Sequence, residues 1–161
     1  MTYPEWVMAL RRAHRASRGH GQRHSGCWVC DVLPSVTEMD RERCLRLSIG
    51  APGTVNGFDG HHVLPKQVLK REVRWPIDVP NVRGGGVHPV MHGSYRVTLD
   101  EVLVDVRVGV PLRRWHHDQW ENRRLHVPRR LIPVGVEEVA LELGLDWWLD
   151  RTFGTNDRRT P

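Results

Sequence analysis

The chain has 161 residues, which is enough for one domain with a modest hydrophobic core. Hydrophobic residues make up 39% of it and charged residues 27%, and no apolar run approaches the roughly 20 residues that span a bilayer, which argues against a membrane-spanning class. The net charge of +5 weakly favours a polyanionic partner such as nucleic acid, although a GC-rich genome would produce the same arginine bias without any function.

The N-terminal segment is predicted to be a basic amphipathic helix. Residues 3–17 have helical apolar spacing, with Pro4 in the first turn and with Gly19 and Gly21 beyond the end. The segment lacks the apolar stretch and cleavage site of a signal peptide. We therefore expect a cytosolic protein.

Residues 20–60 are mixed in composition, with turn-forming glycine, proline and asparagine residues, and are predicted to form loops and short strands. Three cysteines, Cys27, Cys30 and Cys44, in a chain without an export signal argue against a disulfide framework. Cys27 and Cys30 form a CxxC pair, which in a reducing compartment indicates metal or redox chemistry. The alternative is that they are small, partly buried residues.

A strand with two adjacent histidines is predicted after a turn. Asn56-Gly57 is a hairpin signal, and Pro65 ends the strand. Adjacent strand residues point to opposite faces, so one of His61 and His62 could bind a metal while the other faces a reacting group. The alternative is one buried and one exposed histidine without a chemical role.

A second histidine pair follows a glycine-rich turn. His88 and His92 are spaced to lie on one face of a helix, where two imidazoles can share a metal ion, and Pro89 suits the first helical position. Two surface histidines are the alternative. Gly84–Gly86 form either a flexible turn or a place where a phosphate approaches the helix N-terminus. Asn81 is either a turn residue or an amide that fixes the loop.

The later part of the chain has less specific patterns. Valines alternate in residues 102–108, which predicts a half-buried strand, although Thr98 and Glu101 also have the spacing of a helix capping box. Residues 136–150 are predicted to be helical, and Gly144 weakens that pattern.

Residues 112–130 are strongly basic, with six arginines. Trp115 and Trp120 lie among them and could pack on sugars or bases, or they could belong to the core beneath a solvated basic face. We interpret the doublet His116-His117 as a surface feature, because no proline, asparagine and HxxxH follow it at suitable distances.

Taken in order, HHVLP (61–65), the asparagine of PNVR and HPVMH (88–92) resemble the HNH family of nucleases. The HxxxH form is similar to colicin-type sites, and the overall arrangement is similar to phage-encoded HNH endonucleases. The resemblance implies an α+β fold, with a ββα-metal (His-Me finger) HNH core, flanking helices and a small β element. We expect a single domain, 1–161, made of a basic N-terminal helix and arm (1–26), the HNH core (27–97), accessory elements (98–154) and a disordered tail (155–161).

The resemblance also implies a metal-dependent endonuclease that hydrolyses DNA to 5′-phosphate and 3′-hydroxyl ends. His61, His88 and His92 would hold one divalent ion (Mg, Mn, Ni or Zn) that stabilises charge on the phosphate. His62 would take a proton from the attacking water, and Asn81 would hold the loop that aims the His62 ring.

A second CxxC, common in the family, is absent here. A structural zinc would therefore take Cys27 and Cys30 with further ligands from Cys44, His24 or His20. The arginines expected to contact phosphate are Arg83, Arg113, Arg114, Arg123 and Arg124.

DNA is the expected partner, with terminase or other packaging proteins if the chain is phage-encoded, and no membrane. Two alternatives stay open. One is a non-catalytic zinc-binding module that binds DNA, in which the cysteines and histidines only stabilise the fold. The other is a colicin-like nuclease toxin, which predicts an immunity partner.

Overall fold

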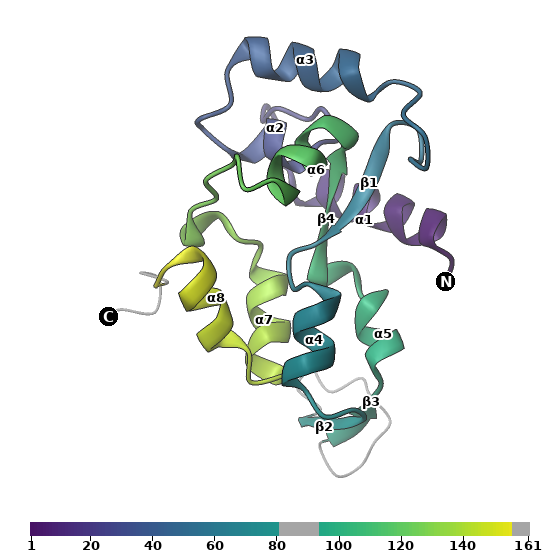
Figure 1. The fold of residues 1–161 in the computed structure, drawn as a ribbon, viewed down its shortest axis with the longest axis vertical. Helices are drawn as coiled ribbons and strands as arrows, with labels where there is room; N and C mark the ends of the chain where they lie inside the picture. The colour runs from purple at the N-terminus through teal and green to yellow at the C-terminus, as the bar shows by residue number, and fades with distance from the viewer. Residues whose placement is uncertain (81–93, 156–161) are drawn as a thin grey trace.

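The computed structural model describes residues 1–80 and 94–155, and within them the fold is α+β, as expected (Figure 1). The helices are α1 (Tyr3–Ser17), α2 (Trp28–Val32), α3 (Glu38–Ser48), α4 (Lys66–Glu72), α5 (Leu99–Leu103), α6 (Arg114–Glu121), α7 (Val134–Glu142) and α8 (Asp146–Phe153), with 3-10 turns η2 (Val106–Val108) and η3 (Arg129–Leu131). The strands are β1 (Phe58–His62), β2 (Ile77–Pro80), β3 (Ser94–Val97) and β4 (Gly109–Arg113). None of the described helices has the length and apolar character needed to cross a membrane.

Two small antiparallel sheets organise the part of the chain that the structure describes. β1 pairs with β4, with His61 opposite Val110 and His62 opposite Gly109, and β2 pairs with β3. The predicted turn before β1 is confirmed: Asn56 and Gly57 have φ of 54° and 84°, and Val55 and Phe58 exchange backbone hydrogen bonds across them. Both central residues have the left-handed conformation that a two-residue hairpin turn requires.

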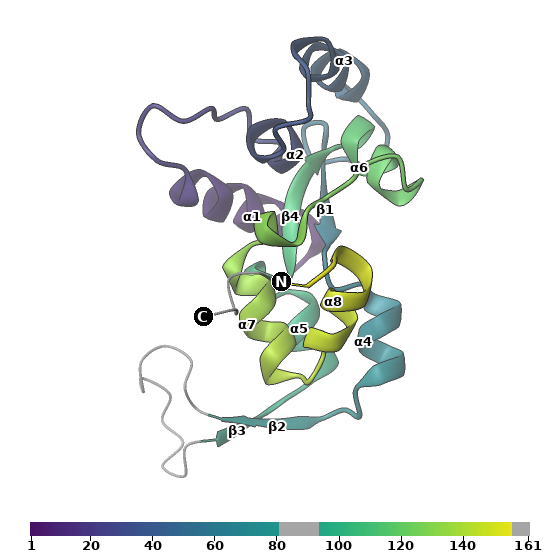
Figure 2. The same ribbon diagram turned by 90° about the vertical axis from the view of Figure 1, so that its left-hand side faces the viewer.

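The β1–β4 pair is covered by α1 on one face and by α6 on the other (Figure 2). Gly60 and Gly109 let α1 approach closely, since a Cβ at these positions would lie 2.3 Å and 2.8 Å from Trp6 ring atoms. β4 runs directly into α6, which packs against the other face of β1. The residues of β1 therefore alternate between the two helices.

The first helix is confirmed with the predicted bounds, and Thr2 and Glu5 form its capping box. The prediction of loops and short strands for residues 20–60 is wrong in part, because α2 and α3 lie there. The reason for α3 is local: Thr37 and Asp40 form a second capping box, and Cys44 faces the core.

The predicted strand at 102–108 is also wrong. The Thr98–Glu101 capping box does form, and it starts α5, whose buried residue is Val102. The Asp105 side chain then caps the 3-10 turn η2 through the Arg107 N–H. The helix predicted at 136–150 is instead two helices, α7 and α8, separated near Gly144, which has φ of 70°.

Candidate metal centres and active-site cleft

Both histidines of the 61–62 doublet line one cleft of about 500 Å³. Its walls come from the end of β1, from α4, from α6 and from α8. The charged or titratable side chains that line it are His61, His62, Lys66, His117, Glu121 and Arg123. Aromatic rings of Trp120, Trp148 and Phe153 form the rest of its lining on that side.

His61 is buried and faces α6. Its Nδ1 lies 3.4 Å from Oε1 of Glu121, and its ring packs 4.3 Å from the ring of Trp120. His61, His117 and Glu121 each offer a ligand atom, and these atoms lie within 4.8 Å of one another. Burial lowers the pKa of His61, although the Glu121 carboxylate acts in the opposite direction. A neutral imidazole is the form that binds a metal.

His117 is oriented by a buried carboxylate. Its Nδ1 lies 3.2 Å from Oδ2 of Asp59, and its Nε2 lies 3.4 Å from Oε1 of Glu121. Asp59 is held by the Arg114 guanidinium at 2.7 Å and accepts a hydrogen bond from the Tyr3 hydroxyl. A carboxylate behind a histidine in this way fixes the ring and the tautomer with Nε2 as the ligand atom.

His62 lies on the opposite face of β1, as the strand geometry predicts. Its ring stacks on Trp6 with centroids 4.3 Å apart, and its Nε2 donates a hydrogen bond to the carbonyl of Leu103 at 2.9 Å. Because a carbonyl only accepts, Nε2 carries the proton and Nδ1 is the basic atom. Burial, and then the charge of Lys66, lowers the pKa of His62, while the bond to Leu103 opposes the shift.

Cys27, Cys30, Cys44 and His116 form a second, fully enclosed group between α2, α3 and α6. Cys30 Sγ lies 3.4 Å and Cys27 Sγ 3.6 Å from Nδ1 of His116, and the sulfurs of Cys27 and Cys44 are 4.0 Å apart. All four residues are 0–1% exposed, and the cysteines form no disulfide. This Cys₃His cluster could bind a metal such as zinc.

The three thiols of the cluster differ in the direction of their pKa shifts. Burial opposes ionisation of Cys27, but hydrogen bonds from Cys30, Cys44 and His116 bring its pKa well below the ordinary value. The hydrogen bond to Cys27 raises the pKa of Cys30, and it raises that of Cys44 to about 12. Cys27 is thus the cysteine of the cluster that ionises most readily.

The fourth ligand corrects the interpretation of His116 as a surface residue. His116 is buried among the cysteines, whereas its neighbour His117 lies at the cleft. Adjacent helical residues point in different directions, so one doublet on α6 contributes to both groups. Of the further ligands considered from sequence, Cys44 belongs to the cluster, and the exposed His20 and His24 do not.

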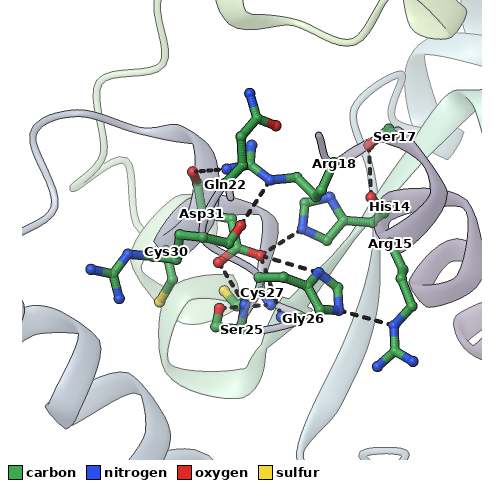
Figure 3. Close-up of polar contacts among 12 residues, drawn as sticks. His14, Arg15, Ser17, Arg18, Gln22, Ser25, Gly26, Cys27, Cys30 and Asp31 are labelled. Carbon is green, nitrogen blue, oxygen red and sulfur yellow. Dashed lines mark hydrogen bonds and ion pairs between the residues drawn. The ribbon is translucent and has the colours of Figure 1, made fainter. Parts of the chain in front are cut away.

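Asp31 anchors the loop that leads into the CxxC pair (Figure 3). Its carboxylate lies 2.7 Å from Nε2 of His14 and accepts hydrogen bonds from the backbone N–H groups of Ser25 and Gly26. Burial raises the pKa of Asp31, but these hydrogen bonds outweigh it, and the pKa is lowered overall. A charged Asp31 therefore holds the chain just before Cys27 in place.

Several predicted site residues lie outside the described residues. They are Asn81, Arg83, Gly84–Gly86, His88 and His92. Of the other predicted phosphate contacts, Arg114 is paired with Asp59, and Arg113 donates to the carbonyl of Ser25. Arg123 lines the cleft, and Arg124 is exposed.

Sequence reasoning missed His117 and Glu121 as partners of His61. The signal was present, because His117 and Glu121 have the same i, i+4 spacing as His88 and His92.

Comparison of the chain with protein-family models, curated proteins and solved structures finds no match.

Proposed function

We propose that this protein is a metal-dependent HNH-type endonuclease that hydrolyses DNA to 5′-phosphate and 3′-hydroxyl ends in the cleft at the end of β1. One observation carries the proposal. His61 and His62 line the same cleft, His61 is grouped with two further metal-ligand side chains, and His62 has its Nδ1 as the basic atom. A hydrolytic metal site needs this combination of an ion and a nearby base.

The side chains around His61 fit a divalent cation. Two imidazoles and one carboxylate, from His61, His117 and Glu121, have ligand atoms within 4.8 Å, and Asp59 supports His117 from behind. Mixed nitrogen and oxygen ligands accept Zn²⁺, Mn²⁺ or Ni²⁺ and, with phosphate and water, Mg²⁺. When bound, such an ion supplies Lewis-acid stabilisation of negative charge on the phosphate.

The remaining steps belong to the side chains of the cleft. His62 accepts the proton of the attacking water at Nδ1, while the Leu103 carbonyl holds the opposite ring nitrogen and Trp6 holds the ring plane. Lys66 and Arg123 carry positive charge into the cleft, where a phosphodiester would bind. The ββα-metal assignment stays part of the proposal: its expected helix at 88–92 lies outside the described residues, and β1, β4 and α6 provide a strand pair and a helix around His61.

The expectation that His88 and His92 complete the metal site stays a prediction. The ligand sets are distinguished by variants: replacing His117 with alanine removes a described partner of His61, and replacing His88 or His92 removes an expected one. If His61 acts with α6, His117→Ala abolishes metal-dependent cleavage and the other two variants retain it.

We further propose that the Cys₃His cluster holds a structural zinc ion. Zinc–sulfur bonds of about 2.3 Å in a tetrahedron place two sulfurs about 3.8 Å apart. The separation of 4.0 Å between Cys27 and Cys44 is close to that value. Complete burial leaves the cluster no open position for a substrate.

The same cluster favours the second candidate function, a non-catalytic zinc-binding module that binds DNA.

Incubation with supercoiled plasmid tests the nuclease proposal. The wild type, His62→Ala and the control His126→Ala are compared in Mg²⁺, Mn²⁺, Ni²⁺ and Zn²⁺; His126 is exposed and does not line the cleft. We expect His62→Ala to cleave about 10²–10⁴-fold more slowly with unchanged DNA binding, and His126→Ala to match the wild type. His62→Ala should stay folded but unfold at a lower temperature, because the stacking on Trp6 and the hydrogen bond to Leu103 are lost. Wild-type DNA binding without cleavage in any metal would favour the non-catalytic module instead.

A further inference from the structure

A second positively charged pocket, of about 240 Å³, lies beside α1. It is lined by Met8, Arg11, Arg12 and Arg15 of α1 and by His24, Ser25 and Gly26 of the following loop. It shares no lining residue with the cleft. Phe58, which contacts Arg11, begins β1, and His62 ends it, so these two residues are about 13 Å apart along the strand.

The arginines of this pocket have no acidic partner among the described residues. Arg11 lies with its guanidinium carbon 4.1 Å above the ring of Phe58, and Arg113 approaches the same ring at 5.3 Å. Burial lowers the pKa of Arg11, and the neighbouring positive charges of Arg15 and Arg113 add to this shift. An anion that binds between like charges held together in this way offsets their repulsion, so its binding is favourable.

The carboxylate of Asp31, which contacts the loop that lines the pocket, has its own partners. Asp31 accepts hydrogen bonds from Ser25 and Gly26 and pairs with His14, and it lies 4.0 Å from Nδ1 of His24 (Figure 3). On the pocket side, Nε of Arg15 donates to Nε2 of His24 at 3.1 Å. This bond uses one donor of Arg15 and orients its guanidinium, whose two terminal nitrogens remain as donors.

We propose that this pocket binds a phosphate of a nucleic-acid backbone, at a contact separate from the cleavage cleft. Guanidinium groups recognise phosphate through paired, charge-assisted hydrogen bonds, and three arginines line this one small cavity. The choice of nucleic acid as the polyanion rests on the proposed function. The pocket itself contributes binding and takes no part in the hydrolysis.

Salt-dependent DNA binding tests this proposal without cleavage. Binding of a 20-base-pair duplex is measured across a NaCl series in the His62→Ala background with no added divalent metal, so failure of the nuclease proposal does not affect the result. The test variant is Arg12→Gln/Arg15→Gln. The control is Arg43→Gln/Arg46→Gln, which removes two exposed arginines at the same spacing from α3.

We expect the test variant to bind about tenfold more weakly at low salt, with a slope of log K against log salt that is shallower by about one, as for loss of one phosphate contact. The control keeps the slope of its parent. An unchanged slope in the test variant, or an equal change in both variants, overturns the proposal. A parallel melt with inorganic phosphate identifies a small-anion site: stabilisation by phosphate with unchanged DNA binding also overturns it.

Discussion

Of the groups of metal-ligand side chains in the described part of the chain, two share α6, where they lie on different sides of the helix and differ in how far solvent reaches them. The Cys₃His cluster has four ligands and is closed, whereas the group of His61, His117 and Glu121 has three and borders a cleft. The Glu121 side chain is 60% exposed, and His116 is 1% exposed. Adjacent histidines of one helix thus contribute to sites of opposite character.

Solvent access determines which chemistry each site can support. A closed tetrahedral site stabilises a fold because no coordination position is open to substrate, and a three-ligand site beside a cleft leaves room for water or phosphate. We therefore expect changes in the cluster to alter stability and changes in the cleft to alter activity.

The largest effect is expected from Cys44→Ser. Serine is a poor zinc ligand, so the variant should lose bound zinc and more than about 4 kcal/mol in the free energy of unfolding. Zinc content and denaturant unfolding, each with and without a chelator, measure this. A chelator should destabilise the wild type and leave Cys44→Ser unchanged, and His20→Ala should behave as the wild type. A wild type that is indifferent to chelator contradicts the structural role.

Glu121→Gln is expected to act on activity alone. The substitution keeps the size of an exposed side chain but removes the charge that faces His61 and His117. Metal affinity or cleavage should fall about 10–100-fold, with an unchanged unfolding midpoint. Metal titration of the cleavage rate measures the change. Equal losses of stability and cleavage would show that the cleft group is structural as well.

Gly60→Ala changes the face of β1 that packs against α1. The added Cβ would meet the Trp6 ring, so the ring on which His62 stacks must shift. We expect a loss of about 1–3 kcal/mol in stability and slower cleavage with unchanged zinc content. Gly19→Ala is the matched control, because Gly19 does not have a left-handed φ and a Cβ there would meet only the exposed Gln22 side chain, at 3.3 Å. A Gly60→Ala protein as active and stable as the wild type contradicts the close packing of Trp6.

The smallest effect is expected from Asp31→Asn. The amide oxygen can still accept the hydrogen bond from the Ser25 N–H, but an NH2 group replaces the oxygen that faces the Gly26 N–H and His14, so the Gly26 bond and the negative charge are lost. The free energy of unfolding should fall by about 1 kcal/mol, with zinc retained and cleavage unchanged. Denaturant unfolding at neutral pH measures it. Loss of zinc from this variant would mean that the loop before Cys27 controls the closed site.

Local patterns predicted the parts of the molecule that local interactions decide. The opposite orientation of His61 and His62 follows from strand alternation, and the turn at Asn56-Gly57 follows from the left-handed conformation. The alternation of valines at 102–108 misled, because the Thr98 capping box starts a helix there and tertiary packing buries Val102.

The composition of both sites depends on contacts between distant segments. His116 meets Cys27 and Cys30 from 89 and 86 residues away, and no local pattern encodes that meeting. His61 meets Glu121, which lies 60 residues further along the chain, because β1 pairs with β4 and β4 leads into α6. The CxxC pair could be recognised from sequence, but its fourth ligand could not.

A side-by-side comparison of His116→Ala and His117→Ala tests the division between the two sites most directly. Zinc content, the unfolding midpoint and plasmid cleavage are measured for each. We predict that His116→Ala loses zinc and unfolds at a lower denaturant concentration, while His117→Ala keeps both properties and loses metal-dependent cleavage. Cleavage at the wild-type rate by His117→Ala, or full zinc retention by His116→Ala, would contradict the account.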